Sequence, residues 1–492
     1  VAVYFFVKNA KKTGFKIFYN EIDDYVKSFE KKEYLRHNKI SDISFDKITP
    51  DAKHNWIKQT DNDWDSLLPL IDKDVKAGKS EEAVFKLFSS GLKTQRDEWV
   101  YDFSENALEA KMRYLVDVYE ATRKDEHFQG KMKIKWDREL DGYRDKNIKK
   151  EFSEKQIHKS IYRPYVSQFL YYDRNFNGMT YLWRDLFRNN EENKYIAISG
   201  IGSNKTFQSI ASNSIVGLDF LEKTQTLPLY IFDKENQKHE NITDWGLTQF
   251  QNHYGESANA EARTTVRAFD AENNQSEAKK STLTNVRVSA SENGAKITKQ
   301  DIFYYTYAVL HSPVYRKKYE QNLKREFPRL PFYAGFTQWR DWGEQLMDLH
   351  INYETQEPFP LERKDLDLGA KQKTKQDNLF AGKAKTEDET FTAKPKTKLR
   401  ADKTNGTIEI DSHTTLTGIP KLAWEYKLGN RSALEWILDQ YKEKKPSDAT
   451  IAERFNTYKF EDYKEQTIDL LKRVCNVSVK TMEIVNQMPN AD

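Results

Sequence analysis

The sequence predicts an α+β (mixed α/β) fold in which a small, aromatic-rich sheet is accompanied by helical lobes. Residues 152–233 concentrate aromatic and β-branched residues in short strand-like runs. Residues 297–350 and 461–487 instead show capped, helix-periodic patterns. The chain has 492 residues, of which 38% are hydrophobic and 13% aromatic, so two or three domains are expected.

Composition excludes several classes of protein. The mean hydropathy is -0.86, and no apolar run approaches the ~20 residues that span a bilayer, so we expect no membrane role. Cys475 is the single cysteine, which excludes an internal disulfide framework and metal sites built on paired cysteines. A reducing, cytoplasmic location is therefore expected. The net charge of +3 does not by itself indicate a nucleic-acid partner.

The first nineteen positions, residues 1–19, predict a β-hairpin, because two partly apolar runs flank turn residues at 9–14. An isolated hairpin is marginally stable, so we expect this one to complete a sheet with strands upstream or to pack on the residues that come after it in the chain. Residues 20–80 are charged and predict short helices joined by loops.

A helical block is predicted over residues 81–123. Its first part has Val84, Phe85, Leu87 and Phe88 on an apolar face, and Ser104 is expected to cap its second part.

The loop over residues 91–99, inside this block, admits two interpretations. It is a solvated polar connection, or its Lys93 and Arg96 face phosphates.

In residues 152–233, arginine alternates with tyrosine around Arg163, Tyr172 and Arg174. This mixture is expected where guanidinium groups meet phosphates or guanine edges and aromatic rings support them. The alternative is that each tyrosine is a half-buried core residue whose hydroxyl is satisfied internally.

Gly200 to Lys205 follow a predicted strand and invite comparison with phosphate-binding loops. The spacing matches neither the dinucleotide glycine pattern nor the Gly-Lys-Ser/Thr ending of a triphosphate loop. A plain tight turn, a loop that faces DNA and a nucleotide-binding loop remain open, with the turn favoured.

Two polar stretches, residues 257–294 and 367–405, predict flexible insertions. The second is rich in lysine, and a basic arm along phosphates is its alternative interpretation. Between the two stretches we predict three helices, over 297–311, from Pro313 to before Pro328, and over 336–350. After the second stretch we predict short strands at 407–410 and 423–426. A helix that begins at Ser432 and a last helix over 461–487 are predicted to complete the chain.

Several motifs in this order resemble the C-terminal specificity region of type ISP restriction–modification enzymes, over about residues 80–490. They are Leu92-Lys93-Thr94 with Asp97 to Tyr101, Tyr162-Arg163-Pro164, Leu170 to Asp173, Ser199 to Gly202, Asp301 to Tyr305 with Leu310 to Tyr315, Phe327 to Pro331, and Gly418-Ile419-Pro420 with Trp424-Glu425-Tyr426.

The resemblance implies that residues 1–79 end an adenine-specific DNA methyltransferase domain and that residues 80–492 form a multi-lobed target-recognition domain for double-stranded DNA. It also implies upstream methyltransferase, translocase and nuclease parts that use S-adenosylmethionine, ATP and Mg. We expect no cofactor, metal site or catalytic residue in this chain, because it has no Asn-Pro-Pro-Tyr motif, early glycine-rich cofactor loop or triphosphate-binding lysine motif.

We expect two lobes, about 80–233 with 295–360 and 406–490, to hold a DNA cleft with the methyltransferase core. The predicted DNA-binding residues are Lys93, Thr94, Arg96, Arg163, Tyr172, Arg174, Arg184, Ser203, Asn204 and Lys205. Among them Lys205 is predicted to hold a phosphate and Arg174 to read a base.

Two other functional classes remain as alternatives. A stand-alone hydrolase has little support, because the nine histidines show no His-Glu-x-x-His or paired metal spacing. A protein-interaction module that uses the C-terminal helices is the other.

Overall fold

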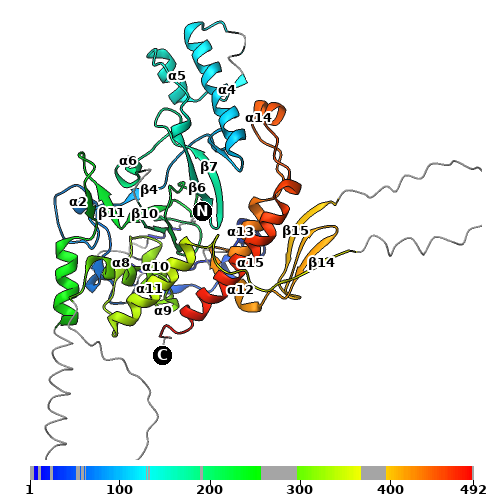
Figure 1. Ribbon diagram of the computed structural model, residues 1–492. Helices are drawn as coiled ribbons and strands as arrows, with labels where there is room; N and C mark the ends of the chain where they lie inside the picture. The colour runs from blue at the N-terminus through cyan, green and yellow to red at the C-terminus, as the bar shows by residue number, and fades with distance from the viewer. Residues whose placement is uncertain are drawn as a thin grey trace, which may run out of the picture.

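The computed structural model shows a body of small antiparallel sheets and helices (Figure 1). It describes residues 5–489 except 9–10, 12, 23–25, 51–55, 57–59, 61, 129, 131–132, 189–191, 256–295 and 367–394. The predicted insertion at 257–294 therefore lies outside the described residues, as do residues 367–394 of the second insertion.

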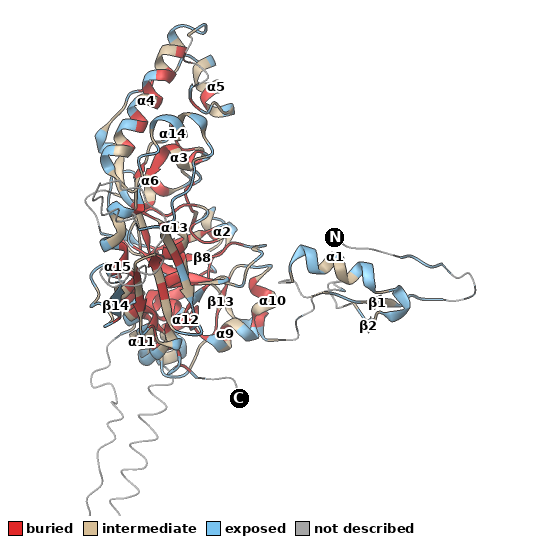
Figure 2. Ribbon diagram, turned by 90° about the vertical axis from the view of Figure 1, so that its right-hand side faces the viewer, coloured by how far each residue is buried: buried red, intermediate tan, exposed pale blue. Residues whose placement is uncertain are grey.

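The N-terminal segment lies to one side of the body (Figure 2). Its strand β1 (Ile17–Tyr19) pairs antiparallel with β2 (Asp46–Ile48), and helix α1 (Ser28–His37) and a 3-10 turn (Ile40–Asp42) lie between them. The predicted hairpin over 1–19 is thus wrong for its described residues, because residues 5–8 form no strand. Which strands pair depends on the packing of the whole chain, and two apolar runs that are neighbours in the sequence need not pair with each other.

The body begins before residue 79. Trp64, Leu70 and Val84 belong to one buried apolar cluster with residues as distant as Met488. A 3-10 turn (Trp64–Ser66), β3 (Leu68–Pro69) and α2 (Lys73–Lys76) precede residue 79, and β3 pairs with β13 (Arg329–Leu330). One continuous core therefore joins the two predicted lobes.

Two sheets occupy the centre of the body, and the predicted sheet region at 152–233 supplies most of their strands. The strand orders are β4-β10-β8-β9 and β5-β7-β6. The bounds are β4 (Ser89–Ser90), β5 (Tyr101–Asp102), β6 (Ile157–Arg163), β7 (Val166–Tyr171), β8 (Tyr195–Ile198), β9 (Ser209–Ser212) and β10 (Gln225–Pro228), with a 3-10 turn (Glu154–Gln156), α6 (Trp183–Leu186) and the hairpin of β11 (Tyr230–Phe232) and β12 (Lys238–Glu240) beside them.

The predicted helical block at 81–123 is half correct. Ser104 accepts a hydrogen bond from the Ala107 amide and starts α4 (Glu105–Lys124), which projects from one end of the body with α5 (Arg138–Asp145) (Figure 1). Residues 81–92 are not helical, and the short α3 (Asp97–Val100) comes after them. Val84 and Phe85 are buried in succession and donate backbone hydrogen bonds to the carbonyls of residues 69 and 70, so tertiary pairing overrides local periodicity.

Of the three helices predicted at 297–350, the first and third are confirmed, and the second, predicted from Pro313 to before Pro328, is divided into two short helices that end at Leu323. Thr298 and Asp301 form a capping box, and Ser312 with Pro313 starts the next helix. The elements are α8 (Lys299–Val309), α9 (Pro313–Lys318), α10 (Glu320–Leu323) and α11 (Phe336–Ile351), with a further helical segment at 244–255.

The C-terminal region packs a sheet of order β14-β17-β16-β15 beside α15 (Phe460–Val485). The other elements are β14 (Glu362–Asp365), β15 (Thr397–Asp402), β16 (Thr407–Asp411), β17 (Thr414–Thr417), α12 (Lys421–Glu425), β18 (Lys427–Leu428), β19 (Arg431–Ser432), α13 (Ala433–Gln440) and α14 (Ala449–Arg454).

This region corrects two predictions and confirms three, of which one is the strand predicted at 407–410, found as β16. The insertion predicted over 367–405 is wrong at 397–402, where β15 pairs with β16, and the strand predicted at 423–426 is helical. The helix that Ser432 caps and the long final helix are both confirmed.

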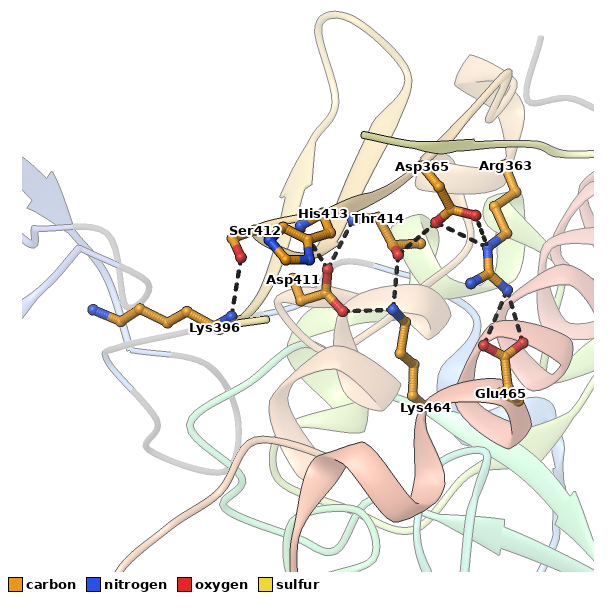
Figure 3. A network of polar contacts seen from close by, with 9 residues as sticks. All are labelled: Arg363, Asp365, Lys396, Asp411, Ser412, His413, Thr414, Lys464 and Glu465. Atoms are coloured by element: carbon orange, nitrogen blue, oxygen red, sulfur yellow. Dashed lines mark hydrogen bonds and ion pairs between the residues drawn. The ribbon is translucent and has the colours of Figure 1, made fainter. Parts of the chain in front are cut away.

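A polar network ties this sheet to α15 (Figure 3). Lys464 lies 2.7 Å from the buried carboxylate of Asp411 and donates to the Thr414 hydroxyl at 2.8 Å. Arg363 pairs with Asp365 and, through a second nitrogen, with Glu465 at 2.8 Å. Burial alone would raise the pKa of Asp411, but hydrogen bonds from Lys464 and from the His413 and Thr414 amides hold that pKa below its ordinary value.

Candidate nucleic-acid interface

A polar pocket of about 330 Å³ lies where three segments far apart in the sequence meet. These are the loop after β4, the end of β6 and the chain after β9. Its lining residues are Leu92, Lys93, Thr94, Gln95, Asp97, Tyr101, Arg163, Gly217, Leu218 and Asp219.

Backbone pairing builds the wall of this pocket. The Leu92 amide donates to the Val216 carbonyl at 2.9 Å, and the Leu218 amide donates to the Leu92 carbonyl at 2.8 Å. This approach needs a glycine at position 91, because a Cβ there would lie 2.4 Å from the Gly217 carbonyl oxygen.

Arg163 reaches the pocket from the turn between β6 and β7. Its guanidinium lies over the Tyr162 ring, 4.0 Å from the ring centre, and 3.8 Å from the Asp97 carboxylate. Asp97 also accepts hydrogen bonds from the Tyr162 hydroxyl and from Thr94. Burial, reinforced by the Asp97 charge, raises the pKa of Tyr162 to about 12, so the phenol stays a neutral donor.

The pocket carries charges of both signs. Lys93 and Asp219 are exposed on its wall, and Asp97 and Arg163 are partly buried. Such a surface offers donors and acceptors together, which suits the edge of a base better than an isolated phosphate.

The structure brings the predicted residues Lys93, Thr94 and Arg163 together on this pocket. Thr94 is buried and uses its hydroxyl on Asp97, so it shapes the pocket wall. Asp97 and Asp219 were not predicted as site residues. Asp219 has no signal in local sequence, because only the pairing of Leu92 with residues 216–218 brings it to this wall. Asp97 does have one, since it lies three residues after Thr94 and its carboxylate accepts a hydrogen bond from the Thr94 hydroxyl.

Arg96, also a predicted DNA-binding residue, points into the protein. It is 3% exposed, donates to the Phe176 carbonyl at 2.6 Å and forms an ion pair with Asp137. A buried charge needs such partners, and they leave this guanidinium unavailable to DNA. We therefore assign Arg96 a structural role.

Tyr172, Arg174 and Arg184 lie around the loop between β7 and α6. The Tyr172 ring is half-buried and packs edge-on against His158 and Phe187. Arg174 is exposed, and Arg184 has an exposed side chain whose Nε lies 3.4 Å from Asp185. Both arginines are accessible to a partner, and their contact with DNA stays a prediction.

The loop with Ser203, Asn204 and Lys205 is a tight turn held by Glu222. The Glu222 carboxylate accepts from the Ser203 hydroxyl at 2.9 Å and from the Asn204 amide at 3.1 Å. Lys205 is half-buried and lies 5.7 Å from the centre of the Trp436 ring. The loop therefore contacts α13, and its contact with DNA also stays a prediction.

Within the residues that the structure describes, no group of three or more His, Cys, Asp or Glu side chains is placed to hold a metal ion. No described helix is long and apolar enough to cross a membrane.

The type ISP C-terminal specificity domain matches residues 83–470, and the chain belongs to that family. No curated protein matches the chain.

Three solved structures share the fold. DrdV, in a complex with DNA, is 40% identical with a TM-score of 0.76, and the match covers 96% of this chain and 43% of DrdV. The type ISP enzyme LlaGI, in complex with a DNA substrate mimic, is 24% identical with a TM-score of 0.69 over 98% of this chain and 40% of that chain. LlaBIII bound to DNA is 22% identical with a TM-score of 0.65 over 91% of this chain and 26% of that chain. The chain thus spans less than half the length of each of these three solved chains.

Proposed function

We propose that this chain recognises specific sequences in duplex DNA and directs adenine methylation and restriction by other parts of a type ISP enzyme. The observation that carries the proposal is the 40% identity over 96% of the chain to DrdV, whose solved structure is a DNA complex. In this proposal residues 1–79 are the end of the methyltransferase part, with Trp64, Leu70 and Ile71 packed into the core of the body. S-adenosylmethionine, ATP and Mg act in domains outside this chain. The protein would work in the cytoplasm, where DNA is its substrate.

The DNA would lie in a cleft between this chain and the methyltransferase core. Lys93, Arg163, Arg174 and Arg184 are the cations that the described surface offers around the pocket and the neighbouring loop. Phosphate contacts would orient the duplex, while the mixed donors and acceptors of the pocket would meet base edges.

Binding of a fluorescent duplex by the full chain at several salt concentrations tests the proposal. Each phosphate contact releases counterions. The logarithm of the affinity should therefore decrease linearly with the logarithm of the salt concentration, with a slope of about 0.9 per phosphate contact. A triple alanine variant at Lys93, Arg184 and Lys205 should lower this slope by the equivalent of about three phosphate contacts.

The matched control removes three other exposed lysines, Lys421, Lys427 and Lys480. It removes the same charge away from the pocket and should leave the slope near that of the unmodified chain. Affinity that does not respond to salt, or no duplex binding at all, would contradict DNA recognition and favour a protein partner or another substrate.

A further inference from the structure

The loop between β7 and α6 is fixed against the loop that lines the pocket. Lys93 and Met179 exchange both backbone hydrogen bonds, at 3.0 and 2.9 Å, and the Gly178 amide donates to the Thr94 carbonyl at 3.2 Å. The Gln95 side chain lies over Gly178, where a Cβ would approach it to 2.5 Å. The two loops therefore form one paired unit.

Contacts with the body hold the base of this unit. The Asn177 side-chain amide donates to the carbonyls of Tyr171 and Asp173, both at 2.9 Å. At the other end, the Leu182 amide donates to the Ser89 hydroxyl at 3.2 Å, and the indole of Trp183 donates to the Ser90 carbonyl at 3.2 Å. A loop fixed at both ends and along one edge presents its exposed side chains in a defined position.

Two of those side chains are apolar or aromatic and face solvent. Met179 is 47% exposed and Tyr181 is 37% exposed. Among the described residues after Trp56, the other large hydrophobic side chains with such exposure are Ile201 and Leu366. Tyr181 also has φ +47°, a left-handed conformation that a residue with a Cβ rarely adopts and that only a rigid surrounding maintains.

Cations surround this apolar pair. Arg174 precedes it on the same loop, Arg184 comes after it in the first turn of α6, and both are exposed. Lys93, exposed at the pocket, is the backbone partner of Met179. The arrangement complements a duplex, in which anionic phosphates flank the apolar faces of stacked bases.

We propose that Met179 and Tyr181 form an apolar wedge that inserts between two stacked base pairs of the bound DNA. The inference rests on the proposed function and adds a mode of recognition to it. Apolar side chains that enter a base step unstack it partly and bend the duplex, and aromatic rings stack on the exposed base face. The wedge would thus add a preference for steps that deform easily, such as pyrimidine–purine steps.

The test uses a short duplex that the full chain selects from a randomised library. A set of copies of this duplex is prepared, each with 2-aminopurine at a different position. This adenine analogue becomes more fluorescent when it unstacks. With the unmodified chain we expect a rise at one base step. The double variant Met179→Ala, Tyr181→Ala should abolish that rise and bind the duplex about tenfold more weakly, because burial of these side chains is lost.

Leu366→Ala is the matched control, because Leu366 is 57% exposed and lies outside the paired loops. It should keep both the fluorescence rise and the affinity, and Met179→Leu should do the same. If the double variant retains the rise and the affinity while the unmodified chain binds normally, the wedge is refuted and DNA recognition stands. If the unmodified chain selects no duplex, the proposed function fails, and the wedge with it.

Discussion

At the scale of residues, charge and burial separate the predicted arginines into distinct roles. Arg96 is buried against Asp137, Arg163 is held between Tyr162 and Asp97, and Arg174 is exposed. The sequence places Arg96 in a polar loop and Arg163 and Arg174 among tyrosines, and all three were predicted to bind DNA. Only the positions of their carboxylate partners, which come from other segments, tell these roles apart.

Arg96→Ala should destabilise the fold. The change leaves the Asp137 carboxylate without its buried partner, which typically costs about 3 kcal/mol. Chemical denaturation measures the loss in the free energy of unfolding. A variant as stable as the unmodified chain but with weaker DNA binding would contradict the structural role.

Arg174→Ala should reduce discrimination between bases. An arginine fork can bridge two acceptors of guanine, so its loss should cost about 1–3 kcal/mol of specificity at one base pair. Competition between cognate and single-mismatch duplexes measures this, with Arg36→Ala in α1 as the control for a lost surface charge. An unchanged ratio of cognate to mismatch affinity would show that Arg174 does not read a base.

Lys205→Ala should weaken binding to every duplex alike. A lysine acts as a point charge toward a phosphate, so its loss should flatten the salt slope by about one unit without changing the ratio between sequences. Salt titration on cognate and unrelated duplexes separates these effects. An unchanged slope would leave Lys205 as a partner of Trp436 alone.

At the scale of elements, local sequence signals predicted the helices well. Ser104, Thr298, Ser312 and Ser432 each cap a helix where expected, because a cap depends on residues within one turn. The failures are the hairpin at 1–19, residues 81–92, β15 and α12. Pairing or packing with residues far along the chain decides the conformation of the first two and of α12. Strand β15 instead pairs with the adjacent β16, and its charged, polar composition gave no strand signal.

The Asp411–Lys464 network should make the C-terminal sheet sensitive to acid. Because the folded-state pKa of Asp411 lies below its ordinary value of 3.8, its stabilisation is present above that pH and is lost as the pH falls through the folded pKa. Asp365 contributes stability with the same pH dependence, because the Thr414 hydroxyl and Arg363 lower its pKa. Asp411→Asn should therefore reduce stability at neutral pH and flatten its acid dependence.

Thermal melting as a function of pH measures this effect. Asp469→Asn, which removes an exposed ion pair with Arg473 on the same helix, is the control and should cost at most about 1 kcal/mol. Equal losses in the two variants would show that the buried network is no stronger than a surface pair.

At the scale of the whole molecule, one core runs from Trp64 to Met488 and joins both predicted lobes. The fold class and the sheet region were predictable from composition and periodicity. The pocket was predictable only in part: Lys93, Thr94 and Arg163 were anticipated, whereas Asp97 and Asp219 were not. Local sequence does not reveal the backbone pairing of Leu92 with residues 216–218 that builds the pocket wall.

The central claim is that this chain discriminates among DNA sequences. Selection from a randomised duplex library by the full chain, followed by measurement of cognate and random-sequence affinities at one salt concentration, tests it most directly. We expect one enriched sequence that binds on the order of a thousandfold or more tightly than random duplex. Binding without enrichment, with equal affinity for all duplexes, would contradict the claim.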